Sequence, residues 1–215
     1  MENRATVFLV DDDPAVRDAV SLFLLSKGYA VELYDSAQQF LDAFTDDTPG
    51  CLVLDIRMPG MSGLELQELL VSRQIKIPII FISGHGDVPI AVRAFKAGAL
   101  DFLEKPFDNH KLLQCIELAI KRDKDRRERQ SERSEMMNRY RQLTPREQEV
   151  MVLVAEGKTN KDIARRLDIS HRTVEIHRRR VMEKLGASSV SDLVSVSVLC
   201  GVYELHAPNH QPVLE

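Results

Sequence analysis

The sequence predicts an α/β domain built around a five-stranded, mostly parallel sheet, joined by a helical connector to an all-α domain. In residues 1–120, short apolar runs alternate with helical patterns five times, which is typical of a parallel sheet with helices on both faces. Residues 121–141 are mainly charged and contain neither Pro nor Gly. Residues 142–206 hold four further helical patterns, and the tail 207–215, with Pro208 and Pro212, is expected to be disordered.

The composition is that of a globular protein. With 215 residues, 44% of them hydrophobic and 29% charged, the chain is long enough for two domains with separate cores. It lacks a basic segment followed by an apolar one at its start, and no apolar run approaches the roughly 18 residues of a membrane span. The widely spaced Cys51, Cys115 and Cys200 favour reduced thiols over a disulfide framework or a metal site. We therefore expect a cytoplasmic protein without a membrane partner.

The charge is distributed unevenly along the chain. Residues 1–120 hold 10 Lys and Arg against 18 Asp and Glu, whereas residues 121–141 hold 9 against 5 and residues 142–215 hold 10 of each. An acidic first part followed by a basic connector indicates two domains with different partners.

Turn and capping residues place the strands and the helices of the first domain. Strands are expected at 6–10, 30–34, 51–55, 78–82 and 100–104, and helices at about 14–27, 36–44, 63–73 and 88–97. Asp13 and Pro14 suit the cap and the first turn of the first helix. Ser36 and Gln39 have the spacing of a capping box at the start of the second.

Charged and polar residues follow the strands at their carboxyl ends, where open α/β sheets place their ligand sites. They are Asp11, Asp12, Asp55, Ser83 and Lys105. Each has an ordinary structural explanation when taken alone, as a helix cap, a turn former or a surface charge. Five such residues at the same end of successive strands are not explained in that way. We therefore expect them to form one site.

The residue types at this edge indicate phosphoryl chemistry. Clustered carboxylates repel one another unless a cation neutralises them, and hard oxygen ligands suit Mg²⁺. An aspartate can act as a nucleophile toward a phosphoryl group and form an acyl phosphate. Lys105 and the hydroxyl of Ser83 could then hold the phosphoryl oxygens.

The first 120 residues resemble the receiver domain of bacterial two-component response regulators, which has a doubly wound, flavodoxin-like sheet. The resemblance lies in Val10-Asp11-Asp12, Leu54-Asp55, Met58-Pro59, Gly63, Ser83 and Phe102 ahead of Lys105-Pro106. It implies that Asp55 is the phosphoacceptor and that Ser83 and Phe102 form the switch pair. It further implies a cis Lys105–Pro106 bond and a Mg²⁺ site made by Asp11, Asp12, Asp55 and the backbone carbonyl of Arg57. Arg57 and His85 occupy positions at which the family sets the lifetime of the acyl phosphate.

The connector is expected to begin with a helix near residue 108. Its apolar side includes Leu112, Leu113, Ile116, Ala119 and Ile120. The mixed charges from 121 to 135 favour helix over coil, and the helix could continue past Tyr140. A solvated helical or flexible tether and a dimerising signalling helix are both open, because the heptad pattern fails in the charged middle.

The last domain is expected to hold a helix-turn-helix. Thr144, Pro145 and Glu147 predict a helix start, and further helices are expected at 160–167, 171–185 and 189–199. The tight turn 168–170 between the second and third helices is typical of proteins that place the later helix in the major groove. The helix at 171–185 has an apolar stripe at Val174, Val181 and Leu185, and its other faces are mainly basic. A solvated charged helix is the simpler alternative, but the turn and its capping favour DNA binding.

Residues 143–200 resemble the LuxR-type helix-turn-helix domain, and both domains together resemble the NarL/FixJ group of response regulators, on its FixJ side. The resemblance lies in Leu143-Thr144, Arg146-Glu147, Gly157, Asn160, Ile163-Ala164, Leu167, Ser170, Thr173-Val174, His177 and Lys184-Leu185. It implies that Glu175, Ile176 and Arg179 face base edges and that Thr173, Arg178 and Lys184 lie toward phosphates, with Arg172 also among the DNA-binding residues. Several relatives have Lys where this chain has Glu175, which could accept from a cytosine amino group and so alter the sequence that is read.

The two resemblances together predict a phosphorylation-controlled transcription regulator. A sensor histidine kinase would transfer a phosphoryl group to Asp55, which adds about 1.5–2 negative charges. The chain would then form a homodimer, bind two half-sites of promoter DNA and act with RNA polymerase. It would be no enzyme beyond promoting its own phosphorylation and dephosphorylation. Whether the unphosphorylated chain is autoinhibited or only monomeric is open.

Two other functions compete with this prediction. One is a phosphatase with an aspartyl nucleophile, but phosphatases that resemble haloacid dehalogenases carry a second acid two residues later, where this chain has Arg57. The other is a phosphorylation-independent DNA-binding regulator that uses the receiver only for dimerisation. The gathering of mutually repelling acids argues against it.

Overall fold

The computed structural model describes residues 5–84 and 88–202, so His85 and the tail from Ala207, which we expect to be disordered, lie outside the described residues. The chain divides into two compact units, Met1–Arg127 and Glu128–Glu215. Among the described residues, no helix is both long and apolar enough to cross a membrane.

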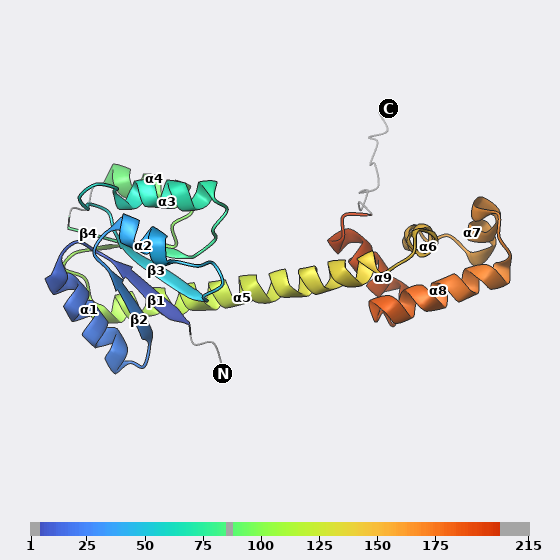
Figure 1. The fold of residues 1–215 in the computed structure, drawn as a ribbon, viewed down its shortest axis with the longest axis horizontal. Coiled ribbons are helices and arrows are strands. Elements are labelled where there is room, and N and C mark those ends of the chain that lie inside the picture. The colour runs from blue at the N-terminus through green and yellow to red at the C-terminus, as the bar shows by residue number, and fades with distance from the viewer. Residues whose placement is uncertain (1–4, 85–87, 203–215) are drawn as a thin grey trace, which may run out of the picture. The chain divides into compact units, whose positions relative to one another are not determined.

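A five-stranded parallel sheet forms the centre of the N-terminal unit (Figure 1). Its strands are β1 (Thr6–Val10), β2 (Ala30–Tyr34), β3 (Gly50–Asp55), β4 (Ile79–Ser83) and β5 (Asp101–Glu104). Their order is β2-β1-β3-β4-β5, and all neighbouring pairs are parallel. This order is that of the doubly wound, flavodoxin-like fold implied by the resemblance to receiver domains.

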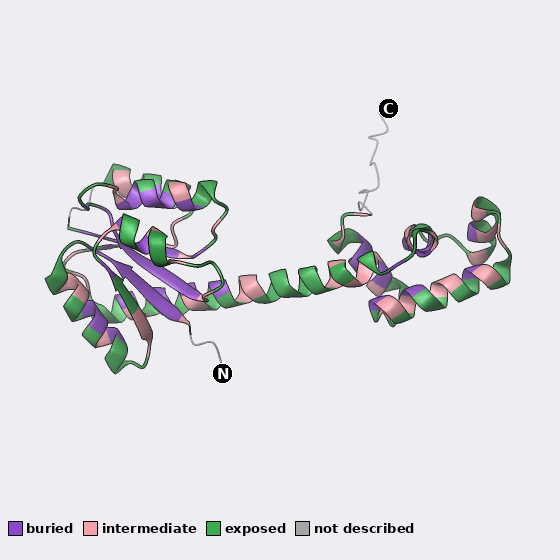
Figure 2. Cartoon of the chain, viewed as in Figure 1, coloured by how far each residue is buried: buried purple, intermediate pink, exposed green. Residues whose placement is uncertain are grey.

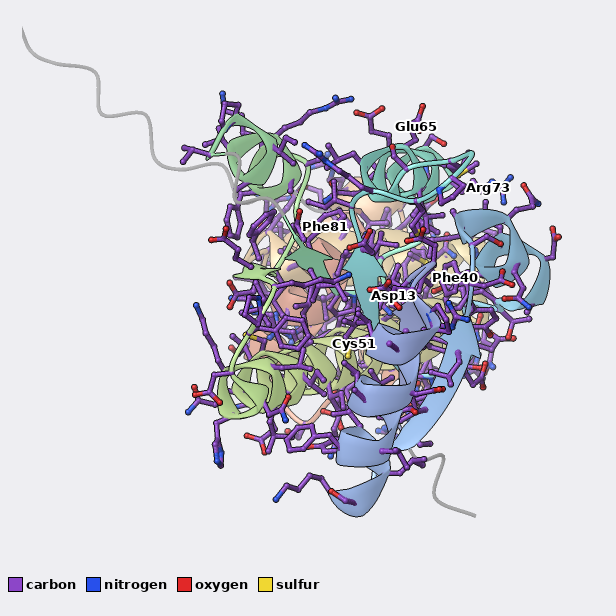
Figure 3. All side chains as sticks on the ribbon, turned by 90° about the vertical axis from the view of Figure 1, so that its left-hand side faces the viewer. Asp13, Phe40, Cys51, Glu65, Arg73 and Phe81 are labelled. Atoms are coloured by element: carbon purple, nitrogen blue, oxygen red, sulfur yellow. The ribbon has the colours of Figure 1, made fainter. Side chains whose placement is uncertain are left out.

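Helices cover both faces of the sheet. One face carries α1 (Pro14–Ser26) and the first part of α5 (Asn109–Arg141), and the other carries α2 (Ala37–Ala43), α3 (Gly63–Ser72) and α4 (Val88–Lys96) (Figure 1). Successive residues of a strand point to opposite faces, so each strand contributes to two separate cores. Figure 3 shows Phe81 on the side of α3 and α4, and Cys51 on the side of α1 and α5.

β1 and β3 are buried along their whole length (Figure 2). A strand covered on both faces has no solvent-facing positions for polar side chains, which explains its continuous apolar sequence. Of the six residues of β3, five are uncharged and the sixth is Asp55, at the carboxyl end of the strand.

Capping largely follows the sequence, with one difference. The carboxylate of Asp13 accepts a hydrogen bond from the Ala15 amide and begins α1. The hydroxyl of Ser36 accepts from the Gln39 amide, but the Gln39 side chain binds the amide of Asp35 rather than that of Ser36. The predicted reciprocal capping box is therefore shifted by one residue, because the amide of Asp35 lies within reach of the Gln39 side chain.

The described part of the C-terminal unit is all helical. After the last part of α5 come α6 (Pro145–Ala155), α7 (Asn160–Leu167), α8 (His171–Leu185) and α9 (Val190–Leu199). Capping boxes at Thr144 and Ser189 begin α6 and α9. Side chains of all the later helices form one core, which includes Val150, Ile163, Val174 and Leu193, and Tyr140 of α5 packs against it.

The fold class predicted from the sequence is therefore confirmed, and the connector is part of one helix. The sequence leaves open whether the tether is helical or flexible. In the structure it is helical, because α5 continues from Asn109 to Arg141 without a break. Its first part packs on the sheet through Leu112, Ile116 and Ala119, as the apolar pattern predicts.

Candidate functional site

The carboxyl ends of the parallel strands bring four of the predicted residues to one edge of the sheet. Asp11 directly follows β1, Asp55 ends β3, Ser83 ends β4 and Lys105 directly follows β5. Asp11, Asp55 and Ser83 are buried. Their position follows from the chain direction, since parallel strands present the same end at the same edge.

Lys105 joins the two buried acids. Its ammonium nitrogen lies 2.6 Å from Oδ2 of Asp11 and 2.8 Å from Oδ1 of Asp55. A buried carboxylate is costly unless a charge and hydrogen bonds compensate it, and here one cation compensates two acids. The two carboxylates lie on strands that are neighbours in the sheet, so the lysine lies across the β1–β3 pair.

The local charges shift the pKa values of this cluster. Burial raises the pKa of Asp55 above its usual range, and the nearby Asp11 raises it further, while hydrogen bonds from Lys105 and the Arg57 amide act in the opposite direction. Burial also disfavours the charged form of Lys105, but its bonds to Asp11 and Asp55 outweigh this and raise its pKa. The ammonium is therefore protonated at neutral pH.

The backbone after Asp55 holds the carboxylate in place. Oδ2 of Asp55 accepts a hydrogen bond from the amide of Arg57 at 2.8 Å. Gly63 begins α3 so close to the strand end that a β-carbon there would lie 2.2 Å from the carbonyl oxygen of Asp55. The amide of Gly63 also donates to the carbonyl of Ile56 at 3.0 Å. A glycine is therefore required to close the loop behind the acid.

The donor set at this edge fits a hard divalent cation in part. The oxygens of Asp11 and Asp55 converge on one cationic group, and oxygen donors of this kind suit Mg²⁺. Asp12 is exposed, and its side chain makes no hydrogen bond or ion pair within the described residues. In the part of the chain that the structure describes, no group of three His, Cys, Asp or Glu residues gathers at metal-binding distances. Two carboxylates are thus in place, with the Lys105 ammonium between them.

Ser83 and Phe102 lie on neighbouring strands beside this cluster. Ser83 is buried, and its carbonyl accepts from the Lys105 amide at 2.7 Å. Phe102 is half-buried and packs against the core on the side of α3 and α4. A residue that is only partly enclosed has room to change its rotamer, which the predicted switch requires.

In the C-terminal unit, α8 follows α7 after a tight turn. Asp168 ends α7 in the left-handed region, with φ of 52°, and Ser170 caps α8 by accepting from the Thr173 amide. Val174, Val181 and Leu185 are buried, as the sequence predicts. The exposed predicted DNA-binding residues are Arg172, Glu175, Ile176 and Arg179, and the half-buried ones are Thr173, Arg178 and Lys184.

Two of these predicted DNA-binding residues bind other elements of the C-terminal unit, whereas Thr173 and Glu175 have partners close by in the sequence, Ser170 and His171. Nη1 of Arg178 donates to Oδ1 of Asn160 at 2.7 Å, which ties α8 to the start of α7. Nζ of Lys184 lies 2.6 Å from Oε2 of Glu147 and 3.2 Å from the carbonyl oxygen of Gln142. Glu147 is buried, so Lys184 neutralises an internal charge.

Comparisons with known proteins agree with both halves of this architecture. Residues 7–117 match the family of response regulator receiver domains, and residues 141–197 match the bacterial regulatory proteins of the luxR family. The chain is 43% identical to the transcriptional regulatory protein FixJ of Bradyrhizobium diazoefficiens over 202 residues, which cover 94% of this chain and 98% of FixJ. It is 46% identical to the response regulator protein TodT of Pseudomonas putida over 198 residues, covering 92% and 87%.

Solved structures extend the similarity to the full fold. The response regulator StyR has a TM-score of 0.84 at 45% identity, covering 91% of this chain and 98% of StyR. Full-length FixJ from B. japonicum has a TM-score of 0.56 at 41% identity, covering 93% and 98%. The chain belongs to the response regulators.

As a response regulator with a LuxR-type domain, the protein is a transcription factor, and its two domains indicate a kinase partner and DNA binding. The family and function predicted from the sequence are confirmed at this level. The Lys105–Pro106 peptide bond is cis, as the resemblance implies.

Sequence reasoning missed several residues that support the response regulator's sites. Nη1 of Arg17 donates to the carbonyl of Asp11 at 2.6 Å and so holds the turn between β1 and α1. Arg146 binds Glu149 and the carbonyl of Leu167, which links α6 to the end of α7. The only sequence signal for Arg17 is its place one helical turn after Asp13. An arginine at such a place does not by itself indicate a bond to the carbonyl of Asp11.

Proposed function

We propose that Asp55 accepts a phosphoryl group from a sensor histidine kinase and that this modification switches dimerisation and sequence-specific DNA binding. The observation that carries the proposal is the arrangement around Asp55: a buried carboxylate at the end of β3, hydrogen-bonded by Lys105, which also binds Asp11. A local ammonium favours the approach of a phosphoryl group, which brings further negative charge.

In the transfer, a carboxylate oxygen of Asp55 forms a bond to phosphorus while the bond from phosphorus to the kinase histidine nitrogen breaks. Lys105 and the hydroxyl of Ser83 then hold phosphoryl oxygens, so both act at the reacting group. Receiver domains use Mg²⁺, which neutralises charge on the phosphoryl oxygens. Asp11, Asp12, Asp55 and the carbonyl of Arg57 would hold it in this chain. Beyond its own phosphorylation and dephosphorylation, the protein catalyses no reaction in this proposal.

The acyl phosphate acts through Ser83 and Phe102. It places about 1.5–2 negative charges beside the end of β4. The hydroxyl of Ser83 turns toward these charges and the ring of Phe102 follows inward, which changes the surface of α4, β5 and α5. Two chains then pair as a homodimer and bind two half-sites about one helical turn apart. Contact with RNA polymerase and a location in the bacterial cytoplasm, where the DNA is, belong to the same proposal.

On the DNA, the exposed face of α8 enters the major groove. Glu175, Ile176 and Arg179 lie toward base edges. Arg172, Thr173, Arg178 and Lys184 complete the proposed set of DNA-binding residues, with Thr173, Arg178 and Lys184 toward phosphates. The bonds of Arg178 to Asn160 and of Lys184 to Glu147 support a positioning role for these two side chains in addition to phosphate contact.

The test is the intact mass of the full chain after incubation with acetyl phosphate and Mg²⁺, with light scattering on the same samples. Wild type is expected to gain one phosphoryl group and to form dimers, and Asp55→Ala is expected to do neither. Asp47→Ala, at an exposed acid outside the site, is the control and should match wild type. An unlabelled wild type would exclude Asp55 as phosphoacceptor and favour the alternative, a DNA-binding regulator that does not depend on phosphorylation. Labelling without dimers would instead indicate release of an autoinhibited domain.

A further inference from the structure

A fourth buried acid lies far from the phosphoacceptor site. Among the described residues, the buried carboxylates are those of Asp11, Asp55, Asp123 and Glu147. The first two belong to the cluster at the carboxyl ends of the strands, and Glu147 pairs with Lys184 in the C-terminal unit. Asp123 lies on α5, with a relative exposure of 1%, and takes part in neither.

Asp123 is fully compensated by three donors. Its Oδ1 accepts from Nη2 of Arg126 at 2.5 Å, and its Oδ2 accepts from Nε of Arg127 at 2.7 Å. Oδ2 also accepts from the backbone amide of Gly50 at 3.1 Å, across 73 residues of sequence. Ion pairs within one exposed helix contribute little to stability, but a buried carboxylate that also binds a distant backbone amide fixes two elements together.

Arg127 extends the contact to the loop before β3. Its Nη2 donates to the carbonyl of Asp46 at 2.7 Å and to that of Thr48 at 3.0 Å. We call Asp123, Arg126 and Arg127, with the backbone of residues 46–50, the α5 clasp. On the loop side these hydrogen bonds are made by backbone atoms, and the Asp46 carboxylate adds a longer ion pair with Arg127 at 3.9 Å. The clasp therefore depends mainly on the conformation of the loop backbone.

The loop end of the clasp is itself held firmly. A β-carbon at Gly50 would lie 1.9 Å from the carbonyl oxygen of Thr6, so the backbone of β1 passes directly against this residue. The Thr6 amide donates to the carbonyl of Pro49 at 2.9 Å. The atom that Asp123 binds therefore belongs to the closely packed amino ends of β1 and β3.

Gly50 and Asp55 are the first and last residues of β3. The same strand thus carries the proposed phosphoacceptor at its carboxyl end and the α5 clasp at its amino end. The α5 residues of the clasp lie at 123–127, and the N-terminal unit ends at Arg127. Beyond it the helix continues as the charged segment that leads to the C-terminal unit.

We propose that Asp123 is a positioning residue that anchors α5 to the amino end of β3 and fixes the course on which the helix leaves the receiver domain. Without it, the last turns of α5 on the receiver keep their helical bonds but lose their attachment to the sheet. The anchor is independent of whether Asp55 is phosphorylated.

The test compares Asp123→Asn with a matched control, Asp125→Asn, in the full-length chain. Asp125 lies on the same helix, and its side chain makes no hydrogen bond or ion pair within the described residues. Arg127→Gln is a second variant, which removes the bonds to the carbonyls of Asp46 and Thr48 and one bond to Asp123. It leaves the buried acid paired with Arg126 and with the Gly50 amide. Hydrogen exchange followed by mass spectrometry reports on segments 44–50 and 121–127. Spin labels at Gln38→Cys on α2 and Gln130→Cys on α5, in a Cys200→Ser background, report the distance distribution between receiver and helix.

Asp123→Asn and Arg127→Gln are expected to accelerate exchange in both segments at least tenfold and to broaden the distance distribution, while Asp125→Asn matches wild type. If Asp123→Asn does not fold, Asp123→Glu decides in its place, because it keeps the negative charge but displaces the carboxylate from the Gly50 amide. Wild-type protection and a wild-type distance distribution in the folded variants would overturn the proposal. Neither readout requires a phosphodonor, so this failure would leave the proposed function of Asp55 standing, and a failure at Asp55 would leave the anchor standing.

Discussion

Glu147 of α6 and Lys184 of α8 form an ion pair of 2.6 Å although they are 37 residues apart in the sequence. Glu147 also closes the capping box of α6, so one buried carboxylate both begins a helix and binds the helix proposed to enter DNA. Lys184→Met is expected to lower the free energy of unfolding of the C-terminal unit by about 1–3 kcal/mol, because a buried charged acceptor loses its partner. Native-state hydrogen exchange of α8 amides in the full chain measures this. Lys161→Met, at an exposed lysine of α7, is the control, and equal exchange in both variants would contradict the prediction.

The same pair predicts an acid dependence. Burial acts to raise the pKa of Glu147, but the bonds from Lys184 and from Thr144 outweigh it and hold the pKa below its usual value of 4.5. The stabilisation is therefore complete above pH 4.5 and is lost as the pH falls through the lower pKa of the folded state. Carbon-detected NMR titration of the Glu147 carboxyl measures this pKa directly. In Lys184→Met the midpoint is expected to rise, and an unchanged midpoint would exclude Lys184 as a cause.

At the phosphoacceptor site, Lys105→Met removes the cation that joins Asp11 and Asp55. A lost hydrogen bond to a charged group costs about 1.5–3 kcal/mol, so labelling of Asp55 by acetyl phosphate is expected to slow by about tenfold to a hundredfold. Time-resolved intact mass gives the rate. Lys111→Met, at an exposed lysine of α5, should label like wild type. A Lys105→Met chain that labels at the wild-type rate would remove Lys105 from the proposed mechanism.

For DNA binding, the two arginines at 178 and 179 are expected to differ. Arg178→Ala removes a phosphate contact, so the slope of log affinity against log salt should decrease in magnitude by about 0.9 on any duplex. Arg179→Ala removes a base contact, so discrimination among duplexes selected from a random pool should fall while binding to unselected duplex is kept. Lys76→Ala, on the receiver domain, is the control. Identical effects of both arginine variants would contradict the assignment of Arg178 to a phosphate and of Arg179 to base edges.

The thiol of Cys115 is expected to be unreactive. Burial and a hydrogen bond to Oδ2 of Asp101 at 3.0 Å raise its pKa to about 12, because both favour the protonated thiol. Alkylation by iodoacetamide in the folded chain should therefore be slow at pH 8 and accelerate about tenfold per pH unit as the thiolate fraction grows. Peptide mass spectrometry locates the label, and Asp101→Asn is expected to speed the reaction. Rapid labelling of wild-type Cys115 at pH 8 would contradict this account.

The sheet and most helix boundaries could be predicted from the sequence because each is determined locally. A strand covered on both faces must be apolar throughout, as residues 51–54 are, and helix starts carry their own caps, as at Asp13 and Thr144. The convergence of Asp11, Asp55 and Lys105 was also predictable, since it follows from the parallel chain direction.

The contacts of Gln39, Asp123 and Lys184 could not be predicted. The Gln39 side chain could bind the amide of Asp35 or that of Ser36, which are neighbours in the sequence, and it binds that of Asp35. Asp123 is one of five acids in a charged segment, and its burial depends on the backbone of a loop 73 residues away. Lys184 is a basic residue on the helix proposed to bind DNA, so the sequence indicates a phosphate contact. Only the packing of α8 on α6 shows its internal partner, Glu147. For Asp123 and Lys184 the deciding partner is far away in the sequence.

A glycine packs against each end of β3, and in each case another backbone segment occupies the space that a side chain would need. At Gly50 the neighbour is the carbonyl of Thr6, and at Gly63 it is the carbonyl of Asp55 itself. In a library containing every single substitution, these two positions should therefore tolerate almost no replacement, even by alanine, although neither glycine carries any reactive group. Among the functional variants of such a library, Gly50 and Gly63 would then be nearly invariant. These two invariant positions would mark the two ends of the strand that connects the phosphoacceptor to α5.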